Sequence, residues 1–206
     1  MTQKERQERS RAEIFQAALK EFSSQDYSQV NMEGICARHG ISKGMMYHYY
    51  SGKDDLFLLC VQDTFENLRE YVEREAVNLG EASVPDRIKN YLLLRECFFQ
   101  DHPERARIFE NAMLRPPEHL AERIQALREP LRRMNEAFLE SVICSMPLRC
   151  GLDRELVLRY LESAEPFFRN VVLRCQAGTQ PQDFRTMLET AEKVLDMVLF
   201  GIFCPQ

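Results

Sequence analysis

Apolar residues recur along this chain at three- and four-residue spacing, the period of an α-helix. The first clear case is the stripe within residues 8–24 that consists of Ile14, Ala17, Ala18 and Phe22. Charged and amide side chains flank this stripe, as expected for a helix with one face packed on a core. The sequence contains no alternating strand pattern of useful length and no internal repeat. The pattern therefore predicts an all-α protein.

Residues 31–53 predict two short helices joined by a tight turn. Asn31 is a suitable cap for the first helix, because its side chain accepts hydrogen bonds from the free N–H groups at a helix start. Gly40 supplies the backbone freedom at which that helix ends, and Ser42 is a suitable cap for the second helix. Two short helices joined by a turn that contains glycine make a helix-turn-helix.

The second helix of this motif carries side chains that suit nucleic acid. Met46 and Tyr50 lie four residues apart and predict its buried side. The polar side chains left to point elsewhere are Lys43, Tyr47, His48 and Tyr49. A cation, phenols and an imidazole are groups that bind phosphate oxygens and base edges. A solvated polar face is the alternative, although aromatic and imidazole groups are an unusual choice for solubility alone.

Helical spacing continues beyond this motif to the C-terminal end of the sequence. A long fourth helix is predicted from Lys53, with an apolar stripe that consists of Phe57, Val61, Phe65, Leu68 and Val72. A further helix is expected from Pro85, since proline suits a first helical turn, and another from residues 101–104, which have the spacing of a capping box. Residues 118–145 predict a long amphipathic helix, and Asp153 is expected to cap the first of two final helices.

The two final helices have apolar faces wider than one neighbouring helix needs. Pairing both helices with their twofold copies would bury the excess, so we predict a homodimer. A monomer whose larger bundle covers these faces is the alternative. The residues expected at the dimer interface are Tyr160, Phe167, Val171, Met187, Ala191, Val194 and Val198.

The middle helices carry Met, Phe and Tyr residues that we expect to point inward. Such residues are more often plain core than a ligand site, but the interior of a helical bundle is a common place for an apolar pocket. The candidate pocket residues are Tyr91, Phe98, Phe109, Met113, Met134, Phe138 and Phe168.

The composition is ordinary for a soluble globular protein, with 45% hydrophobic and 29% charged residues in a chain of 206. The longest apolar runs, such as residues 194–203, are interrupted by polar or glycine residues and are too short to span a bilayer. The chain opens without the basic stretch and apolar segment of a secretory signal. We therefore expect a cytoplasmic protein that does not enter a membrane.

A formal net charge of −5 is unusual for a protein that binds DNA. Screening limits charge effects to about 8 to 10 Å, so the local charge matters more than the total. Within residues 31–53 the basic side chains are Arg38, Lys43 and Lys53, against the single acid Glu33. The N-terminus adds Lys4, Arg6, Arg9 and Arg11, against Glu5 and Glu8. The end of the chain that would face DNA is therefore locally positive.

Seven cysteines are scattered along the chain without a C-x-x-C pair or a histidine at metal-ligand spacing. We therefore expect no metal site, and cysteines that serve as small buried apolar residues in a reducing compartment. A redox sensor that uses Cys144 and Cys150, the closest pair in sequence, is the alternative. Arg149 is the one neighbouring cation that would favour a reactive thiolate there.

The sequence lacks the motifs of common enzymes. It contains no G-x-S-x-G, H-E-x-x-H, Walker or dinucleotide-binding glycine pattern. Two of the four histidines, His39 and His48, fall in the motif of residues 31–53, and the other two, His102 and His119, lie close to prolines. We therefore expect neither an enzyme nor a cofactor.

One long pattern in the N-terminal quarter resembles a known family. It runs Ile14-x-x-Ala17-Ala18-x-x-x-Phe22 and then Ile35-x-Ala37-x-x-Gly40-Ile41-Ser42-x-Gly44-x-x-Tyr47-x-Tyr49-Tyr50-x-x-Lys53-x-x-Leu56. Its residue types and spacing resemble the N-terminal DNA-binding domain of TetR-type bacterial transcription regulators. Four positions depart from the residues usual in that family, namely Asn31, Gly34, Cys36 and Tyr50. Three of them keep capping, size or apolar character, whereas Gly34 predicts a looser helix.

The resemblance implies an all-helical protein of two domains. Residues 1–55 would form a three-helix helix-turn-helix DNA-binding domain, and residues 56–206 a helical bundle for ligand binding and dimerisation. The second helix of the motif would enter the major groove of one half of a near-palindromic operator in duplex DNA. The residues expected at the DNA are Asn31, Ser42, Lys43, Gly44, Met45, Tyr47, His48, Tyr49 and Lys53.

The resemblance also implies a role for single residues of this set. Lys43 would bind a phosphate or a guanine edge, Tyr47 would contact a phosphate or a thymine methyl, and His48 would read a base. Tyr49 and Lys53 would hold phosphates. Gly44 would allow close approach to the DNA, and the capping residues Asn31 and Ser42 would add contacts to the DNA backbone.

The implied mechanism is that of a dimeric repressor controlled by a small-molecule effector. An effector that enters the bundle would favour a tilt of the subunits that separates the reading helices from successive grooves. An activator, or a regulator that acts through a protein partner, is the alternative with the same fold. An enzyme or carrier that keeps a relic of the motif is the alternative of another class.

Overall fold

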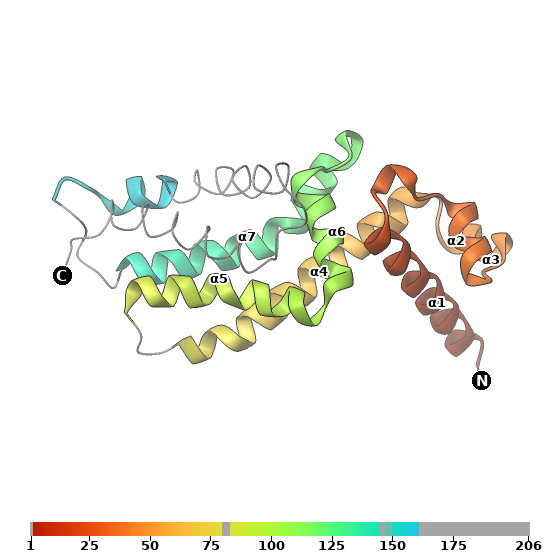
Figure 1. Cartoon of the computed structure of the whole chain (residues 1–206), viewed down its shortest axis with the longest axis horizontal. Coiled ribbons are helices and arrows are strands. Elements are labelled where there is room, and N and C mark those ends of the chain that lie inside the picture. The colour runs from red at the N-terminus through yellow and green to blue at the C-terminus, as the bar shows by residue number, and fades with distance from the viewer. Residues whose placement is uncertain (1, 80–82, 145–147, 149, 161–206) are drawn as a thin grey trace, which may run out of the picture. The chain divides into compact units, whose positions relative to one another are not determined.

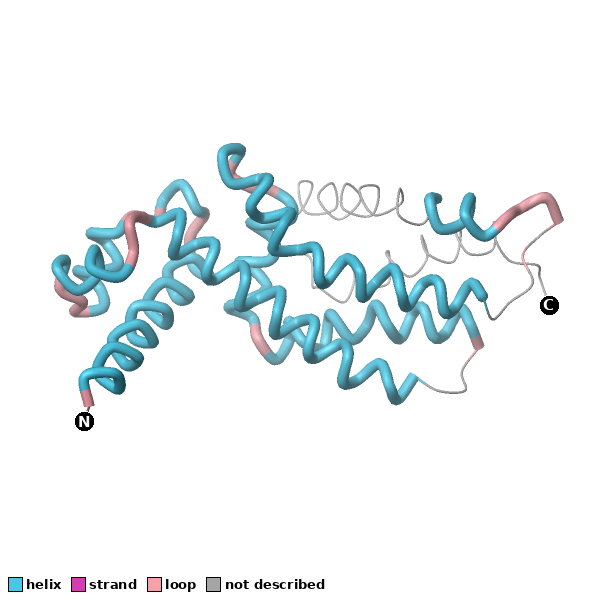
Figure 2. The backbone as a smooth tube through the Cα atoms, turned by 180° about the vertical axis from the view of Figure 1, so that it is seen from behind, coloured by secondary structure: helices cyan, strands magenta, loops and turns pink. Residues whose placement is uncertain are grey.

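The structure, a computed structural model, describes residues 2–79, 83–144, 148 and 150–160. Its regular elements are helices (Figure 1 and Figure 2). In chain order they are α1 (Gln3–Ser24), η1 (Tyr27–Gln29), α2 (Met32–His39), α3 (Lys43–Tyr49), α4 (Lys53–Ala76), η2 (Val77–Leu79), α5 (Val84–Asp101), α6 (Pro103–Leu114), η3 (Glu118–Leu120) and α7 (Ala121–Cys144). A further helical segment covers residues 154–160. The predicted all-α fold class is confirmed.

The chain divides into two compact units. Unit 1 consists of Met1–Val72 and Arg95–Leu131, and unit 2 of Glu73–Leu94 and Arg132–Gln206. The helices α4, α5 and α7 each contribute to both units. The predicted domain boundary after residue 55 falls inside unit 1, and it remains a prediction.

The core of unit 1 forms around the apolar stripe of α1. All four residues of the predicted stripe are buried, with Ile14, Ala18 and Phe22 fully shielded from solvent. Tyr27 packs between α1 and α4, because its ring lies 6.3 Å from the ring of Phe22 and 5.0 Å from that of Phe57. The connection between α1 and α2 therefore fills the space between α1 and α4.

The helix starts lie within one residue of the predictions except at α1, α6 and α7. The predicted helix of residues 118–145 starts only at Ala121, because residues 118–120 form η3. α1 begins five residues earlier than expected, because Thr2 and Glu5 form a capping box in which each side chain accepts from the other residue's backbone N–H. The capping box predicted from Asp101 is wrong, since Asp101 still belongs to α5 and α6 starts after it, at Pro103. At the last described helical segment the predicted cap is confirmed, because Asp153 Oδ1 accepts from the N–H of Leu156 at 2.7 Å.

Candidate nucleic-acid interface

Local hydrogen bonds define both ends of the two short helices. Asn31 Oδ1 accepts from the backbone N–H of Gly34 at 2.7 Å, and Ser42 Oγ accepts from that of Met45 at 3.1 Å. Gly40 adopts a φ of 67°, the left-handed conformation in which a helix commonly ends and which glycine adopts at little cost. These contacts confirm the caps and the turn predicted from the sequence, so α2 and α3 form the expected helix-turn-helix.

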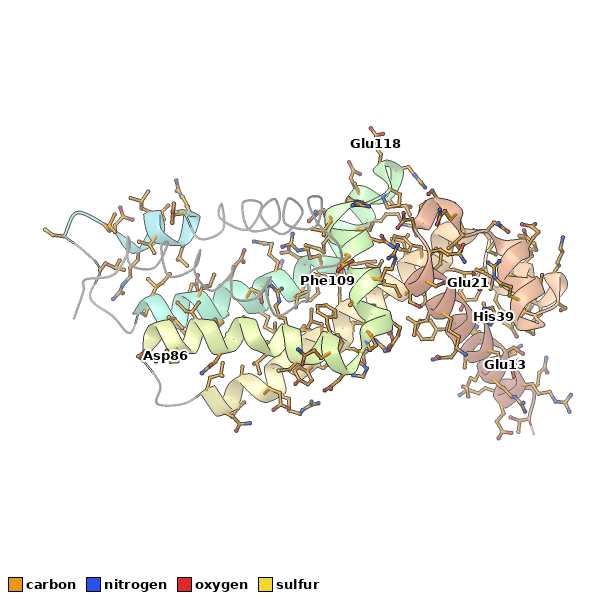
Figure 3. All side chains as sticks on the ribbon, viewed as in Figure 1. Glu13, Glu21, His39, Asp86, Phe109 and Glu118 are labelled. Carbon is orange, nitrogen blue, oxygen red and sulfur yellow. The ribbon has the colours of Figure 1, made fainter. Side chains whose placement is uncertain are left out.

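A buried carboxylate holds α2 against α1. Glu21 on α1 is only 5% exposed, and its Oε1 accepts from Arg38 Nε at 2.7 Å while its Oε2 pairs with the other guanidinium nitrogen. His39 Nε2 lies 3.0 Å from the same Oε1 (Figure 3). The hydrogen bonds from Arg38, with a smaller contribution from His39, hold the pKa of Glu21 below its ordinary value although burial opposes this. We call Glu21, Arg38 and His39 the Glu21 cluster.

The Glu21 cluster was missed in the sequence. Arg38 was expected to add to the positive charge that faces DNA, but the structure gives its guanidinium a buried carboxylate partner on α1. The available signal was an acidic residue next to Phe22 within the apolar stripe of α1. A charged residue on a buried face requires a partner of opposite charge, because an unpaired buried charge is costly. The identity of that partner cannot be predicted from the sequence alone.

α3 buries one side and exposes the other. Met46 is fully buried and Tyr50 is partly buried, as predicted. Lys43, Tyr47 and His48 are exposed, and the exposed fraction of Tyr47 is 48%. A helix that is anchored by one buried methionine and shows a cation, a phenol and an imidazole to solvent has the surface that a DNA groove would meet.

Gly44 leaves this surface flat near the start of α3. A Cβ atom built on Gly44 meets no heavy atom within 4 Å among the described residues. The position is exposed, and its backbone is helical with a negative φ. The glycine is therefore not required by the packing of the described residues, and it leaves the backbone of α3 accessible at this position.

Two of the exposed aromatic side chains have partners within the protein. Tyr47 Oη donates to Glu33 Oε1 on α2 at 3.0 Å, and this hydrogen bond raises the pKa of the phenol. The rings of His48 and Tyr49 meet edge to face, with centroids 4.8 Å apart. These contacts restrict the side-chain rotamers on α3, so the surface is partly ordered before any ligand arrives.

Arg11 brings a charge from α1 to the surface of α3. Its guanidinium carbon lies 5.3 Å from the centroid of the Tyr49 ring, within the range of a cation–π contact. The positive charge of the N-terminus was expected from the sequence, but its placement beside Tyr49 was not. Arg11 is exposed, so its charge is available next to the aromatic side chains of α3.

Lys53 points back into the protein. Its Nζ donates to the carbonyl oxygens of Tyr27 at 3.1 Å and Val30 at 3.2 Å, and it lies 4.2 Å from the centroid of the Tyr27 ring. The expected contact between Lys53 and a phosphate remains a prediction. In the described conformation this ammonium stabilises the connection between α1 and α2.

The comparisons with known proteins agree with this geometry. Residues 14–60 match the family model described as bacterial regulatory proteins, tetR family. The N-terminal part of the chain therefore matches the tetR family of bacterial regulatory proteins. The matched segment contains the second half of α1, all of α2 and α3, and the first turns of α4. No curated protein matches the chain in sequence.

Solved structures of TetR-type regulators have the same fold. FadR from Bacillus subtilis in complex with stearoyl-CoA is 16% identical with a TM-score of 0.67, and the match covers 92% of this chain and 98% of that one. NalD of Pseudomonas aeruginosa, the secondary repressor of a multidrug efflux pump, is 21% identical with a TM-score of 0.66, covering 98% and 100%. The ketosteroid regulator KstR2 of Mycobacterium tuberculosis is 18% identical with a TM-score of 0.59, covering 95% of each chain.

The described residues of the predicted pocket belong to two groups, one in each unit. In unit 1, Phe109 lies 5.8 Å from Phe65 and 4.9 Å from Phe99 between ring centroids, and Phe99 lies 5.2 Å from Phe98. Met113 is buried in the same unit. These contacts are those of a packed aromatic core, so the pocket in this unit remains a prediction.

The second group lies in unit 2. The rings of Tyr91 and Phe138 stack with centroids 3.7 Å apart, and Tyr91 Oη donates to Asn135 Oδ1 at 2.9 Å. Met134 is partly buried in this unit, and Phe168 lies outside the described residues. The paired phenol and amide give this otherwise apolar group a polar side.

The predicted dimer interface lies mostly outside the described residues. Only Tyr160 of the predicted set is described, and its side chain is exposed, as is that of Leu156 one turn earlier. The interface therefore remains a prediction. Among the described residues, no helix has both the length and the apolar character that a membrane span requires. The described residues also contain no group of three or more His, Cys, Asp or Glu side chains that could hold a metal ion.

Proposed function

We propose that this protein is a TetR-family repressor that binds a near-palindromic operator as a homodimer and is released by a small-molecule effector. The observation that supports it best is the surface of α3, where Lys43, Tyr47 and His48 are exposed around an unobstructed Gly44. Two solved relatives add support, since NalD is described as a repressor and FadR was solved with stearoyl-CoA. We place the protein in the cytoplasm, with the DNA-binding domain in residues 1–55 and the ligand-binding and dimerisation domain in residues 56–206.

Each exposed group on α3 has a separate role in this proposal. Lys43 binds a phosphate or a guanine edge, Tyr47 a phosphate or a thymine methyl, and His48 reads a base edge. Tyr49 adds a phosphate contact and shares it with Arg11, which lies over its ring. Met45 packs at the edge of the groove, and the two capping residues, Asn31 and Ser42, contact the DNA backbone. Lys53 has to share its ammonium between a phosphate and the carbonyl groups that it now binds.

Release of DNA in this mechanism is a shift between two populations. The two reading helices of a dimer must fit successive major grooves, which lie about 34 Å apart. An effector that binds better to a conformation in which the two reading helices lie at a different distance reduces the population of dimers that can bind DNA. The aromatic residues of the middle helices are the proposed lining of the effector site, which suits a largely apolar ligand.

Replacing Lys43 by Ala tests the DNA contact of α3. We expect weaker binding to every duplex and a salt dependence that is flatter by about one unit of slope, because one phosphate contact is lost. The measurement is fluorescence anisotropy with labelled duplexes from the region flanking the gene, at several salt concentrations. An unchanged slope would remove Lys43 from the interface.

Replacing His48 by Ala tests base reading on the same duplexes. We expect a change in sequence preference of about 1–3 kcal/mol at one base pair, with little change in binding to unrelated DNA. The measurement is competition between operator variants that differ at single positions. Equal weakening on all sequences would show that His48 contacts the DNA backbone instead.

A further inference from the structure

Two segments of unit 1 that are far apart in sequence meet along a row of three pairs, each between an acidic and a basic side chain. Arg107 Nη2 on α6 lies 3.0 Å from Asp26 Oδ1, which precedes η1. His119 Nε2 in η3 lies 3.0 Å from Asp54 Oδ2 in the first turn of α4. Arg123 Nη2 on α7 lies 3.9 Å from Asp55 Oδ1 in that same turn. We call these three pairs the seam.

The acidic and the basic side chains of the seam come from two different segments. The acidic partners all belong to residues 26–55, the end of the chain that carries α2 and α3, which we call the head. The basic partners all belong to residues 107–123, the connection from α6 through η3 to α7. Figure 1 shows the chain that follows α1 beside the chain that follows α6, and Figure 3 labels Glu118 at the start of η3. Such complementarity between two surfaces selects one register of contact.

The middle of the seam is built on the core of unit 1. Tyr27 Oη donates to Asp54 Oδ1 and lies 3.3 Å from His119 Nε2. The hydrogen bond from Tyr27, assisted by His119, keeps the pKa of Asp54 below its ordinary value, so its carboxylate is ionised at neutral pH. Because Tyr27 is packed against Phe22 and Phe57, Asp54 presents a fixed acceptor to the imidazole.

The seam supplies a directional contact that apolar packing does not. α1 packs on α6 within unit 1, but burial of apolar surface has little directional preference. Ion pairs fix the distance between particular atoms. The side chains of Asp26 and Arg107 are each 46% exposed, so water competes for them and the pair breaks and forms readily. The seam therefore favours one orientation of the head without locking it.

We infer that the seam sets the orientation of the head, and that Arg107, His119 and Arg123 are positioning residues for operator recognition without being DNA ligands themselves. This inference rests on the proposed function of the chain as a dimeric DNA-binding protein. A head held at one orientation restricts the distance between the two α3 helices of a dimer, and hence the number of base pairs between half-sites. Contacts of α3 with a single half-site are independent of that distance.

The test is selection of operators from a library of random duplexes by the full-length protein. The selected duplexes report the half-site sequence and the spacing between half-sites separately. Asp26→Arg places a cation opposite Arg107, and the Asp26 side chain that it replaces makes no capping bond to η1 in the described structure. We expect this variant to select the same half-site with a broader range of spacings, and to bind the best-spaced operator about fivefold more weakly.

The charge exchange provides the matched rescue. In the double variant Asp26→Arg with Arg107→Asp, the ion pair is restored with its charges reversed, so we expect the parental spacing preference to return. Arg115→Ala serves as the control, because Arg115 is an exposed cation at the end of α6 outside the seam, and we expect it to select parental spacings. A second single variant, His119→Ala, is expected to broaden the spacing in the same direction as Asp26→Arg.

The outcomes separate this inference from the proposed function. If the seam variants select parental spacings while Lys43→Ala weakens DNA binding, the seam does not orient the head and the DNA-binding proposal stands. If Lys43→Ala changes nothing, the proposed function fails. Thermal unfolding of each variant is measured alongside, since loss of folded protein weakens binding to every duplex equally. Equal weakening without a change in spacing overturns the inference.

Discussion

The Glu21 cluster and the seam use the same chemistry in different surroundings. Glu21 is shielded from water and binds two side chains of α2 at once, whereas both side chains of the Asp54–His119 pair are substantially exposed. A shielded carboxylate that loses its partners cannot regain its hydration, so breaking such a cluster is costly, whereas an exposed pair contributes about 0–1 kcal/mol. The comparison indicates that α2 is firmly attached to α1, whereas the pairs between the head and residues 107–123 exchange with water.

The largest effect is expected from breaking the Glu21 cluster. Glu21→Gln replaces a carboxylate oxygen by an NH₂ group that faces the donors of Arg38, and it leaves a buried polar group poorly satisfied. We expect the free energy of unfolding to fall by about 1–3 kcal/mol, measured by urea unfolding followed by circular dichroism. Glu13→Gln is the matched control on α1, because Glu13 pairs with Arg9 in solvent (Figure 3) and should change stability by less than about 1 kcal/mol. Equal effects of the two substitutions would contradict the comparison.

An intermediate effect on the free energy of unfolding is expected when the pH is lowered. The folded-state pKa of Glu21 lies below its ordinary value of 4.5, so the stabilisation by the cluster is complete above the unfolded-state pKa and is lost as the pH falls through the folded-state pKa. The difference in unfolding free energy between the parent and Glu21→Gln should therefore shrink as the pH is lowered from neutral to about 3. Urea unfolding at each pH measures it. A difference that stays constant over this range would mean that the carboxylate is not ionised in the folded protein.

The smallest effect on stability is expected in the seam. His119→Ala removes one exposed pair, and we expect the free energy of unfolding to change by less than about 1 kcal/mol. The measurement is the same urea unfolding experiment near neutral pH. A loss as large as that of Glu21→Gln would show that the seam stabilises the fold itself, and the contrast between the two clusters would disappear.

Features that depend on neighbouring residues were predictable from the sequence. The caps at Asn31, Ser42 and Asp153 each bond a backbone N–H only three residues away, so the residue types at two positions determine the contact. The buried side of α1 was predicted for a similar reason, because the period of the helix assigns its residues to faces. The early start of α1 was also available, since Thr2 and Glu5 have capping-box spacing.

Competition between neighbouring elements was harder to predict. Residues 101–104 have the spacing of a capping box, but α5 continues through Asp101 and so removes it from the cap of α6. The local pattern allowed both outcomes. Packing of the helix that precedes a break decides where that helix ends, and this packing involves residues that the pattern does not contain.

The sequence alone determined the helical fold, the positions of most helix ends and the presence of a helix-turn-helix that exposes Lys43, Tyr47 and His48, because these follow from contacts within one or two turns. Only the tertiary structure decided where the charges pair. Arg38 finds Glu21 across 17 residues, Lys53 turns toward carbonyls 26 and 23 residues away, and His119 meets Asp54 across 65 residues. A charged side chain is long and accepts many partners, so its choice depends on which segments the folded chain brings together.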